Sequence, residues 1–348
     1  MKTFNYASLA NKAWSSDVVA LIAQVHEYKG RQEMFLAQKP TALDKLTEIA
    51  KIQSTEASNK IEGIVTTDAR IRQLCEEKVA PKTRDEEEIS GYRDALKTIH
   101  ENYEYISVTS GYILQLHKIL YGYSAKSIGG RFKNVQNYIS EIRSDGTAVT
   151  RFTPLAPYET PGAIDDLCEN YNRAIDSGAV DPLILIPTFI SDFLCIHPFN
   201  DGNGRMSRLL TTLLLYRSGY VVGRYVSLES KIEKTKETYY DVLKEVSAGW
   251  YEDNNDNTPF IKYLLGVVLS AYRDFESRIS LVDSKLSAIE LVRNAVNKQI
   301  GKFTKRGIME LCPSLEKSSV GASLKALVEF GEISMQGSGK NTFYVRKK

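Results

Sequence analysis

Hydrophobic residues recur with a helical period over most of the chain, from Leu43 to Arg278. Two apolar segments in this region, 183–196 and 209–216, predict a pair of buried helices. The twelve residues between them are mostly polar, so we expect a loop that gathers polar side chains between the two helices. A further long helix is predicted over residues 260–280. The pattern therefore indicates a mainly α-helical protein.

One stretch departs from the helical period. A turn signal, Ser-Asp-Gly-Thr at 144–147, lies between two short segments with strand-forming residues. The first segment begins at Tyr138 and Ile139, and the second consists of Val149, Thr150, Arg151 and Phe152. We therefore predict a β-hairpin over about residues 138–153.

The last part of the chain has its own pattern. Short helices are predicted over residues 289–297, 305–311 and 318–330, and a hairpin over residues 333–335 and 342–345. Three helices followed by a two-stranded wing resemble a winged helix-turn-helix domain. At 348 residues the chain is too long for one small core. We predict an N-terminal helical region (1–85), a central helical core with the hairpin (86–280) and a winged-helix-like domain (282–348).

Charge separates this last part from the rest. The net charge of the chain is +2, but residues 282–348 carry twelve Lys and Arg against six Asp and Glu. A basic surplus suits the phosphate backbone of DNA. The third helix would then present Ser318, Ser319, Ser323 and Lys325 to it. Winged helices also serve as protein-interaction modules, so both DNA and a protein remain candidate partners.

Cysteine usage and hydropathy bear on location. The four cysteines lack the spacing of a metal site, and we expect them to be reduced and buried. No signal-peptide pattern follows Met1. The longest apolar stretch, around residues 183–196, contains Pro187 and Asp192 and is too short to span a bilayer. We therefore expect a cytoplasmic protein that does not enter the membrane.

The most informative stretch is residues 197–208, His-Pro-Phe-Asn-Asp-Gly-Asn-Gly-Arg-Met-Ser-Arg. Gly202 and Gly204 give the backbone conformations that let successive N–H groups converge on one point. The following helix, beginning near Asn203, directs its positive dipole end at the same point. This combination predicts a site for phosphate oxygens.

Four side chains of the stretch add chemistry. Arg205 and Arg208 lie three residues apart on the helix, and each offers a planar fork of donors to a phosphate. Asp201 is the hard oxygen ligand that Mg²⁺ takes together with substrate phosphates. His197 is the nearby residue that accepts a proton at neutral pH. Because the phosphate loop of nucleoside triphosphatases is absent, we predict a different kind of nucleotide-polyphosphate site with a base beside it.

The order of these residues resembles the motif of the Fic family, His-Pro-Phe-x-Asp-Gly-Asn-Gly-Arg-x-x-Arg, at every fixed position. The resemblance implies a mainly α Fic-type helical bundle that transfers AMP from ATP to a Ser, Thr or Tyr hydroxyl of a target protein or of itself. It implies that His197 deprotonates the hydroxyl and that Asp201 holds Mg²⁺. It also implies phosphate binding by Gly202, Asn203, Gly204, Arg205 and Arg208, with Arg208 taking the γ-phosphate.

A second segment, Ser-Asn-Lys-Ile-Glu-Gly at 58–63, matches the inhibitory signature of the same family. Ser58 and Glu62 are four residues apart on a helix predicted over about residues 43–63, so they share one face. The resemblance implies that Glu62 pairs with Arg208 and occupies the guanidinium that the γ-phosphate needs.

Two further assignments follow from the resemblance. The hairpin at 138–153 corresponds to the flap, whose edge pairs with an extended stretch of the target protein by strand addition. Val149 to Phe152 would then lie against the nucleotide or the target. Tyr239, next to Tyr240, corresponds to a residue near the adenine.

Other functions remain open at this point. The chain could be a DNA-binding regulator whose Fic core senses nucleotides. Relatives of this fold also transfer phosphate, other nucleotides or phosphocholine, and Glu62 could activate a water that removes AMP. Homodimer formation also remains open.

Overall fold

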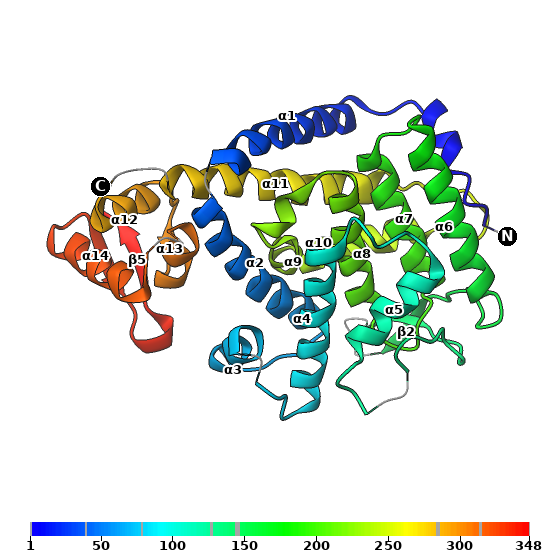
Figure 1. Cartoon of the computed structure of the whole chain (residues 1–348), viewed down its shortest axis with the longest axis horizontal. Coiled ribbons are helices and arrows are strands. Elements are labelled where there is room, and N and C mark those ends of the chain that lie inside the picture. The colour runs from blue at the N-terminus through cyan, green and yellow to red at the C-terminus, as the bar shows by residue number, and fades with distance from the viewer. Residues whose placement is uncertain are drawn as a thin grey trace.

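The computed structural model of the chain describes residues 2–38, 40–77, 79–125, 128–142, 147–282, 286–312 and 315–347. Helices dominate, and two small antiparallel sheets accompany them (Figure 1). The helices are α1 (Ser16–Gln38), α2 (Pro40–Ile61), α3 (Asp68–Arg72), α4 (Arg84–Asn102), α5 (Ser110–Leu120), α6 (Thr160–Ser177), α7 (Pro182–Ile196), α8 (Asn203–Arg217), α9 (Leu228–Lys234), α10 (Lys236–Ser247), α11 (Thr258–Val282), α12 (Ala288–Asn297), α13 (Lys305–Leu311) and α14 (Lys317–Glu329). The strands are β1 (Ile139–Ile142), β2 (Ala148–Phe152), β3 (Lys302–Phe303), β4 (Ile333–Gln336) and β5 (Phe343–Arg346). The mainly α fold expected from the sequence is confirmed.

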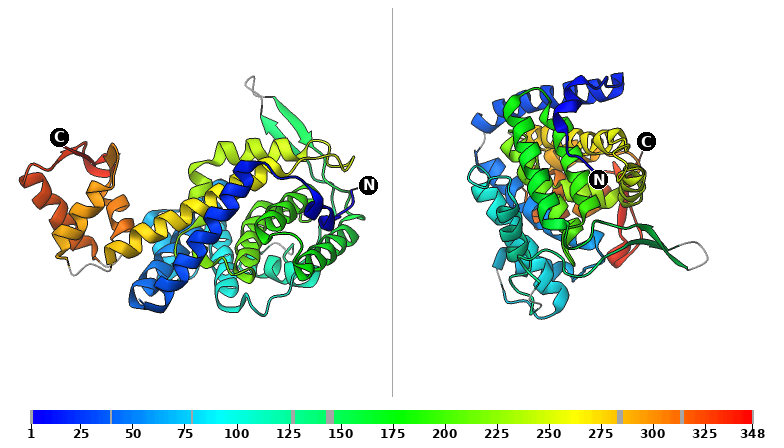
Figure 2. Two further views of the ribbon diagram at one scale, coloured as in Figure 1. Left: turned by 90° about the horizontal axis from the view of Figure 1, so that it is seen from above. Right: turned by 90° about the vertical axis from the view of Figure 1, so that its right-hand side faces the viewer.

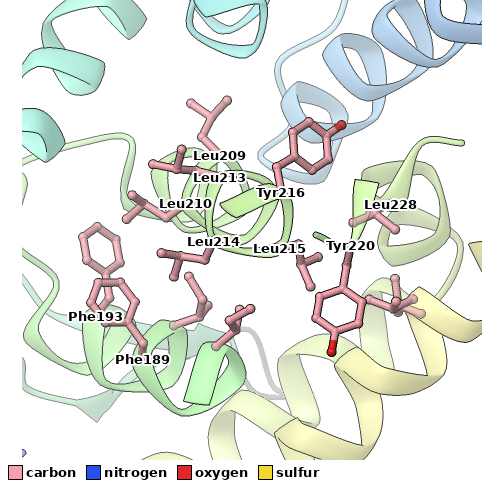
Figure 3. Packing of buried hydrophobic residues seen from close by; sticks show 14 of the residues in the cluster. Phe189, Phe193, Leu209, Leu210, Leu213, Leu214, Leu215, Tyr216, Tyr220 and Leu228 are labelled. Atoms are coloured by element: carbon pink, nitrogen blue, oxygen red, sulfur yellow. The ribbon is translucent and has the colours of Figure 1, made fainter. Parts of the chain in front are cut away.

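The two predicted buried helices, α7 and α8, form the centre of the molecule. The Asp181 side chain accepts a hydrogen bond from Leu183 N and so caps the start of α7. Nearly every residue of both helices is buried. Figure 3 shows phenylalanines of α7 and leucines of α8 in one apolar cluster, with side chains of the neighbouring helices around them. Burial of this cluster holds the connecting loop between two fixed helix ends.

The N-terminal region packs into the same core. Helix α1 lies along α11, and α2 lies beside α4 and α9 (Figures 1 and 2). Phe4, Val18, Leu46 and Ile61 belong to the apolar cluster that contains α7 and α8. Most buried apolar residues of 2–282, called the main body below, therefore belong to one large core, and Ile71, Leu74 and Ile89 form a smaller cluster of their own. Helix α2 is a wall of that core.

The predicted β-hairpin is present as β1 and β2, which pair antiparallel with an irregularity between Ile139 and Ser140. It projects from the main body in the left view of Figure 2. Its base is anchored by Phe152, whose ring stacks on Tyr251 at a centroid distance of 5.8 Å. The predicted turn residues 144–146 lie outside the described residues.

Residues 288–347, called the C-terminal unit below, have an apolar core of their own. The three short helices are found as predicted, and β4 and β5 form the predicted hairpin. Strand β3 was not predicted; it pairs with β5 and makes a three-stranded sheet in the order β3-β5-β4. The expectation that Ser323 faces outward was wrong, since it is 5% exposed and lies on the same helix face as Val320, Leu324 and Leu327.

Two general expectations can be compared with the structure. All four cysteines are free, and Cys168, Cys195 and Cys312 are buried while Cys75 is half-buried. Across the described ranges, no helix combines the length and the apolar character that crossing a bilayer would require.

Candidate functional site

The loop between α7 and α8 is held from inside by its own residues. Helix α7 ends at Ile196, and the next residue, His197, adopts the left-handed backbone conformation with φ of 53°. Asn203 closes the loop: its Oδ1 accepts from Phe199 N at 2.9 Å, and its Nδ2 donates to Phe199 O at 2.7 Å. The Asn203 side chain thus shapes the loop, and its backbone N–H remains at the start of α8.

Residues from other elements hold the same loop from behind. The His117 ring stacks on Phe199 with a centroid distance of 3.7 Å. Gly130 N donates to its Nδ1, which leaves the proton on Nε2, and Nε2 donates to Asp201 O at 3.1 Å. Burial lowers the pKa of His117 to about 4, so the ring is neutral at pH 7. His117 is a structural residue of this loop.

Helix α8 begins after Gly202, which has a φ of 85°. A side chain at this position would meet Tyr121 at 3.0 Å, so the backbone conformation and the space both favour glycine. A Cβ at Gly204 would overlap Glu62 Oε1. The Glu62 carboxylate therefore lies against the first turn of α8, at the end of the helix dipole that attracts anions.

Arg208 is buried and bound to the segment that the sequence marked as inhibitory. Its Nε donates to Ser58 Oγ at 2.8 Å, and its Nη2 donates to Ser58 O at 2.9 Å and to Glu62 Oε1 at 2.8 Å. Gly63, with a φ of 80°, follows the end of α2 and turns the chain there. Burial alone would lower the pKa of Arg208, but the Glu62 carboxylate raises it above its ordinary value, so the guanidinium stays charged.

His197 lies at the mouth of the loop with one ring nitrogen engaged. Its Nδ1 lies 3.2 Å from Leu194 O and donates to it, which leaves Nε2 as the proton acceptor. Burial lowers the pKa of His197 to about 4; Lys133 and Arg151 act in the same direction, and Glu62 opposes them. The imidazole is therefore neutral at pH 7 and able to accept a proton.

Arg205 and Arg208 share one helix but face different partners. Arg205 Nη2 lies 2.8 Å from Glu88 Oε2 and donates to Tyr121 Oη at 2.9 Å. The same guanidinium lies 3.9 Å from Asp201 Oδ1. Arg205 therefore reaches toward α4 and α5, whereas Arg208 reaches toward α2. The structure does not bring the two arginines onto one point.

Asp201 lies on the open side of the loop with a 41% exposed side chain. Its Oδ1 accepts from Gly202 N at 2.8 Å, which orients the carboxylate at the start of α8. Within the described ranges, no cluster of three or more His, Cys, Asp or Glu side chains has the arrangement of a metal site. A single carboxylate fits the way Mg²⁺ is held when substrate phosphates and waters complete its shell.

An aromatic wall lies between this loop and the hairpin. Tyr239 of α10 is 4% exposed and packs against Tyr240, Phe260 and Tyr263. Burial raises the pKa of Tyr239, and the positive charge of Arg208 opposes part of that increase. The Tyr239 hydroxyl therefore lies close enough to Arg208 to be influenced by its charge. Arg151 of β2 donates from Nη1 to Tyr240 O at 3.5 Å and connects the hairpin to α10.

Known proteins contain similar sequences and a similar fold. Residues 107–215 match the family model described as Fic/DOC family. This part of the chain is therefore similar to a Fic domain. It is 29% identical over 271 residues to the protein adenylyltransferase Fic of Drosophila erecta, which covers 75% of this chain and 50% of the relative, and 28% identical over the same length to that of Drosophila melanogaster. The chain thus spans about half the length of the curated relatives it matches.

Solved structures show the same fold. A Fic family protein from Desulfovibrio desulfuricans G20 aligns with a TM-score of 0.62 at 21% identity over 97% of both chains. Residues 134–508 of Fic-1 from C. elegans align with a TM-score of 0.61 at 20% identity, over 76% of this chain and 74% of that one.

In the part of the chain that is similar to a Fic domain, the residues quoted in the motif lie at one end of α8. His197, Gly204, Arg208 and Glu62 are brought together around the first turn of that helix. Val149 and Thr150 lie on the projecting strand of the hairpin, and Thr150 is exposed. Ser58 lies in α2 and Glu62 directly follows the last residue of that helix, far from the motif in sequence.

Sequence reasoning missed two residues behind the Fic motif. Lys133 is 3% exposed, and its Nζ donates to Ile196 O at 3.0 Å and to Asn137 Oδ1 at 3.1 Å. Asn137 Nδ2 in turn donates to Phe199 O at 2.9 Å. Burial lowers the pKa of Lys133 to about 8. Nothing in their local sequence distinguishes these residues from ordinary loop residues.

Proposed function

We propose that this protein is an autoinhibited protein adenylyltransferase, which transfers AMP from ATP to a hydroxyl group of a target protein or of itself. The observation that carries the proposal is the neutral His197 ring beside the first turn of α8. A proton acceptor and an anion-attracting helix end are the two features that attack of a hydroxyl on a phosphate requires.

In the proposed reaction, His197 Nε2 accepts the proton of the target hydroxyl as its oxygen attacks the α-phosphorus. The bond from that phosphorus to the bridging oxygen breaks, and pyrophosphate leaves. The backbone N–H groups at the start of α8, with Gly202 and Gly204 allowing close approach, hold the phosphates in place. Arg208 neutralises the outermost one. Positioning and charge neutralisation therefore carry most of the catalysis.

Asp201 would hold Mg²⁺ together with the phosphate oxygens, consistent with its exposed carboxylate at the start of α8. When bound, the ion supplies charge neutralisation on the leaving pyrophosphate. Arg205 would act from behind, through its ion pair with Glu88 and its contact with Asp201.

Inhibition would come from Glu62. Its carboxylate takes an Arg208 donor and lies against Gly204, so a γ-phosphate that approached Arg208 would meet a negative charge there. Ser58 fixes two further contacts of the guanidinium. ATP would then bind with its phosphates displaced from the geometry of attack.

The hairpin would receive the target. Strand β2 pairs only with β1 among the described residues, so its outer edge can accept an extended peptide by strand addition. Arg151 and Phe152 connect this strand to the aromatic wall of α10 and to Tyr251. A target peptide held there would place its hydroxyl near His197.

The test is transfer of label from ATP to protein. We expect Glu62→Gly to incorporate label from α-³²P-ATP with Mg²⁺ and none from γ-³²P-ATP, while the wild type incorporates little. Glu48→Gly, on the solvent face of the same helix, is the matched control and should behave as the wild type. Incorporation of γ-label would identify phosphate transfer instead, and absence of both labels in the Glu62 variant would refute the proposal.

We also propose that the C-terminal unit is a winged helix-turn-helix domain with α14 as the recognition helix. The order helix, strand, helix, helix, strand, strand supports this, as do the basic surplus and the exposed Lys325 and Ser318 on α14. The full chain should bind duplex DNA with an affinity that falls steeply as salt rises, and Lys325→Gln should reduce the slope. No binding at low salt would refute DNA as the partner of this unit.

A further inference from the structure

A second polar site lies on the side of α2 that faces the C-terminal unit. Residues of α2, α9, α11 and α13 line a partly open cavity of about 210 Å³. Its charged lining residues are Glu56, Lys60, Lys231, Glu233, Lys234, Asp274, Arg278, Arg306 and Glu310. A water in the liquid occupies about 30 Å³, so the cavity has room for a small solvated anion.

Arg278 of α11 is the unusual member of this lining. It is 5% exposed, and its Nε and Nη1 have no hydrogen-bond partner among the described residues. Burial lowers its pKa, and the nearby Asp274 and Glu310 only partly oppose that effect. A buried guanidinium without a hydrogen-bonded anion is costly, so such a group is normally paired.

The acidic residues of the cavity are already engaged with other cations. Asp274 pairs with Lys231 and Glu233 with Lys60, each at 2.8 Å. Arg306 pairs with both remaining acids. It lies 2.8 Å from Glu56 and 3.6 Å from Glu310. In these pairs three cations face four acids, so the lining as a whole carries a net charge of +1, and Arg278 and the exposed Lys234 are the cations outside the pairs.

We propose that this cavity binds a small free oxyanion of the phosphate class, held by the guanidinium of Arg278 with Lys234 at its edge. The planar fork of an arginine matches two oxygens of a tetrahedral oxyanion. The site is separate from the first turn of α8, because none of its lining residues belongs to the Fic motif.

The anion would also bear on α2. Gln53, Ala57 and Lys60 of α2 line the cavity, and the same helix carries Ser58, with Glu62 at its end. An anion held by Arg278 of α11 and Lys234 of α9, in the cavity that these α2 residues line, stabilises α2 in the place it has here. Resting on the proposed function, this makes the anion a ligand that strengthens inhibition.

Calorimetric titration of the full chain with inorganic phosphate tests the site, with a non-hydrolysable ATP analogue present to fill the Fic motif. Wild type and Arg273→Met, an exposed arginine on the same helix, should bind one phosphate with a Kd of about 1 mM or tighter. Arg278→Met should bind it at least about tenfold more weakly. Equal binding by Arg278→Met and wild type, or no binding by the wild type, would overturn the proposal.

Thermal unfolding separates binding from a purely structural role. Without phosphate, Arg278→Met should unfold at or above the wild-type temperature, because the substitution removes a buried charge that has no hydrogen-bonded partner. Phosphate should raise the midpoint of the wild type and leave that of the variant unchanged. A variant that is less stable than wild type by the same amount with and without phosphate would show that Arg278 only supports packing.

Amide hydrogen exchange of α2 tests the coupling without measuring AMP transfer. Phosphate should slow exchange in α2 of the wild type and have no effect in Arg278→Met. Unchanged exchange in a phosphate-saturated wild type would overturn the coupling to α2. None of these measurements requires catalysis, so their failure is distinguishable from failure of the proposed adenylyltransferase activity.

Discussion

The main body and the C-terminal unit bury different kinds of side chain. In the main body, Arg205, Arg208, Asp192 and Asn203 are among many polar or charged residues that are nearly inaccessible. In the described part of the C-terminal unit, Ser323 is the single buried polar residue. Burying polar and charged groups costs free energy unless they are paired, so a fold concentrates them where they have a use. We therefore expect the functional polar groups of the main body to be largely buried, and any functional polar groups of the C-terminal unit to lie on its surface.

The largest expected effect comes from the buried site of the main body. In a Glu62→Gly background, His197→Ala should lower AMP transfer by about 10²–10⁴-fold, because the general base is lost. ATP affinity, measured by calorimetry, should change little, since the histidine acts on the target hydroxyl. Retained transfer in a folded His197→Ala variant would show that the buried site lacks the role given to it.

Acid should weaken the main body selectively. Burial lowers the pKa of His100 to about 3 and that of His117 and His197 to about 4. The unfolded chain then binds more protons than the folded one between pH of about 6.5 and 4. The free energy of unfolding therefore falls as the pH falls through this window, by about 1.4 kcal/mol per pH unit for each histidine. The C-terminal unit contains no histidine.

Urea unfolding followed by tryptophan fluorescence checks this prediction, because Trp14 and Trp250 both lie in the main body. The urea concentration at the unfolding midpoint should decrease as the pH is lowered from 6.5 to 5. His100→Gln should make that decrease smaller. A midpoint that is constant over this range would contradict the assignment of neutral, buried histidines.

The smallest effect is expected at the junction between the two regions. The Arg306–Glu56 pair joins α13 to α2 at 2.8 Å, but the arginine side chain is 57% exposed. Exposed pairs contribute about 0–1 kcal/mol. A double-mutant cycle with Arg306→Gln and Glu56→Gln, measured by thermal unfolding, should give a coupling energy in that range. A larger coupling energy would mean that this ion pair contributes more to holding the two regions together than its exposure predicts.

Much of the fold could be predicted from patterns among residues that are close together in the sequence. Helices α7 and α8 and the glycine-spaced loop between them follow from residues that are neighbours in the chain. The β1–β2 hairpin and the helices of the C-terminal unit do so as well. Strand β3 was not predicted, because two residues are too few for an alternating pattern to be recognised.

The contacts that complete the site depend on tertiary structure. Lys133 is 63 residues from Ile196, whose carbonyl it binds, and nothing about an isolated lysine predicts burial. Arg205 is predicted to bind phosphate, and its ion pair with Glu88 of α4 through Nη2 could not be read from the sequence. Such pairings arise from the packing of α4 and α5 on α8, which the periodicity of each helix does not specify.

The most direct test of the account is whether Glu62 acts through Arg208. AMP transfer should be measured with α-³²P-ATP in wild type, Glu62→Gly, Arg208→Ala and the double variant. We predict that Glu62→Gly alone raises transfer and that Arg208→Ala removes the gain, because we propose that the guanidinium released by Glu62 holds the γ-phosphate. A double variant as active as Glu62→Gly would contradict the pairing as the mechanism of inhibition.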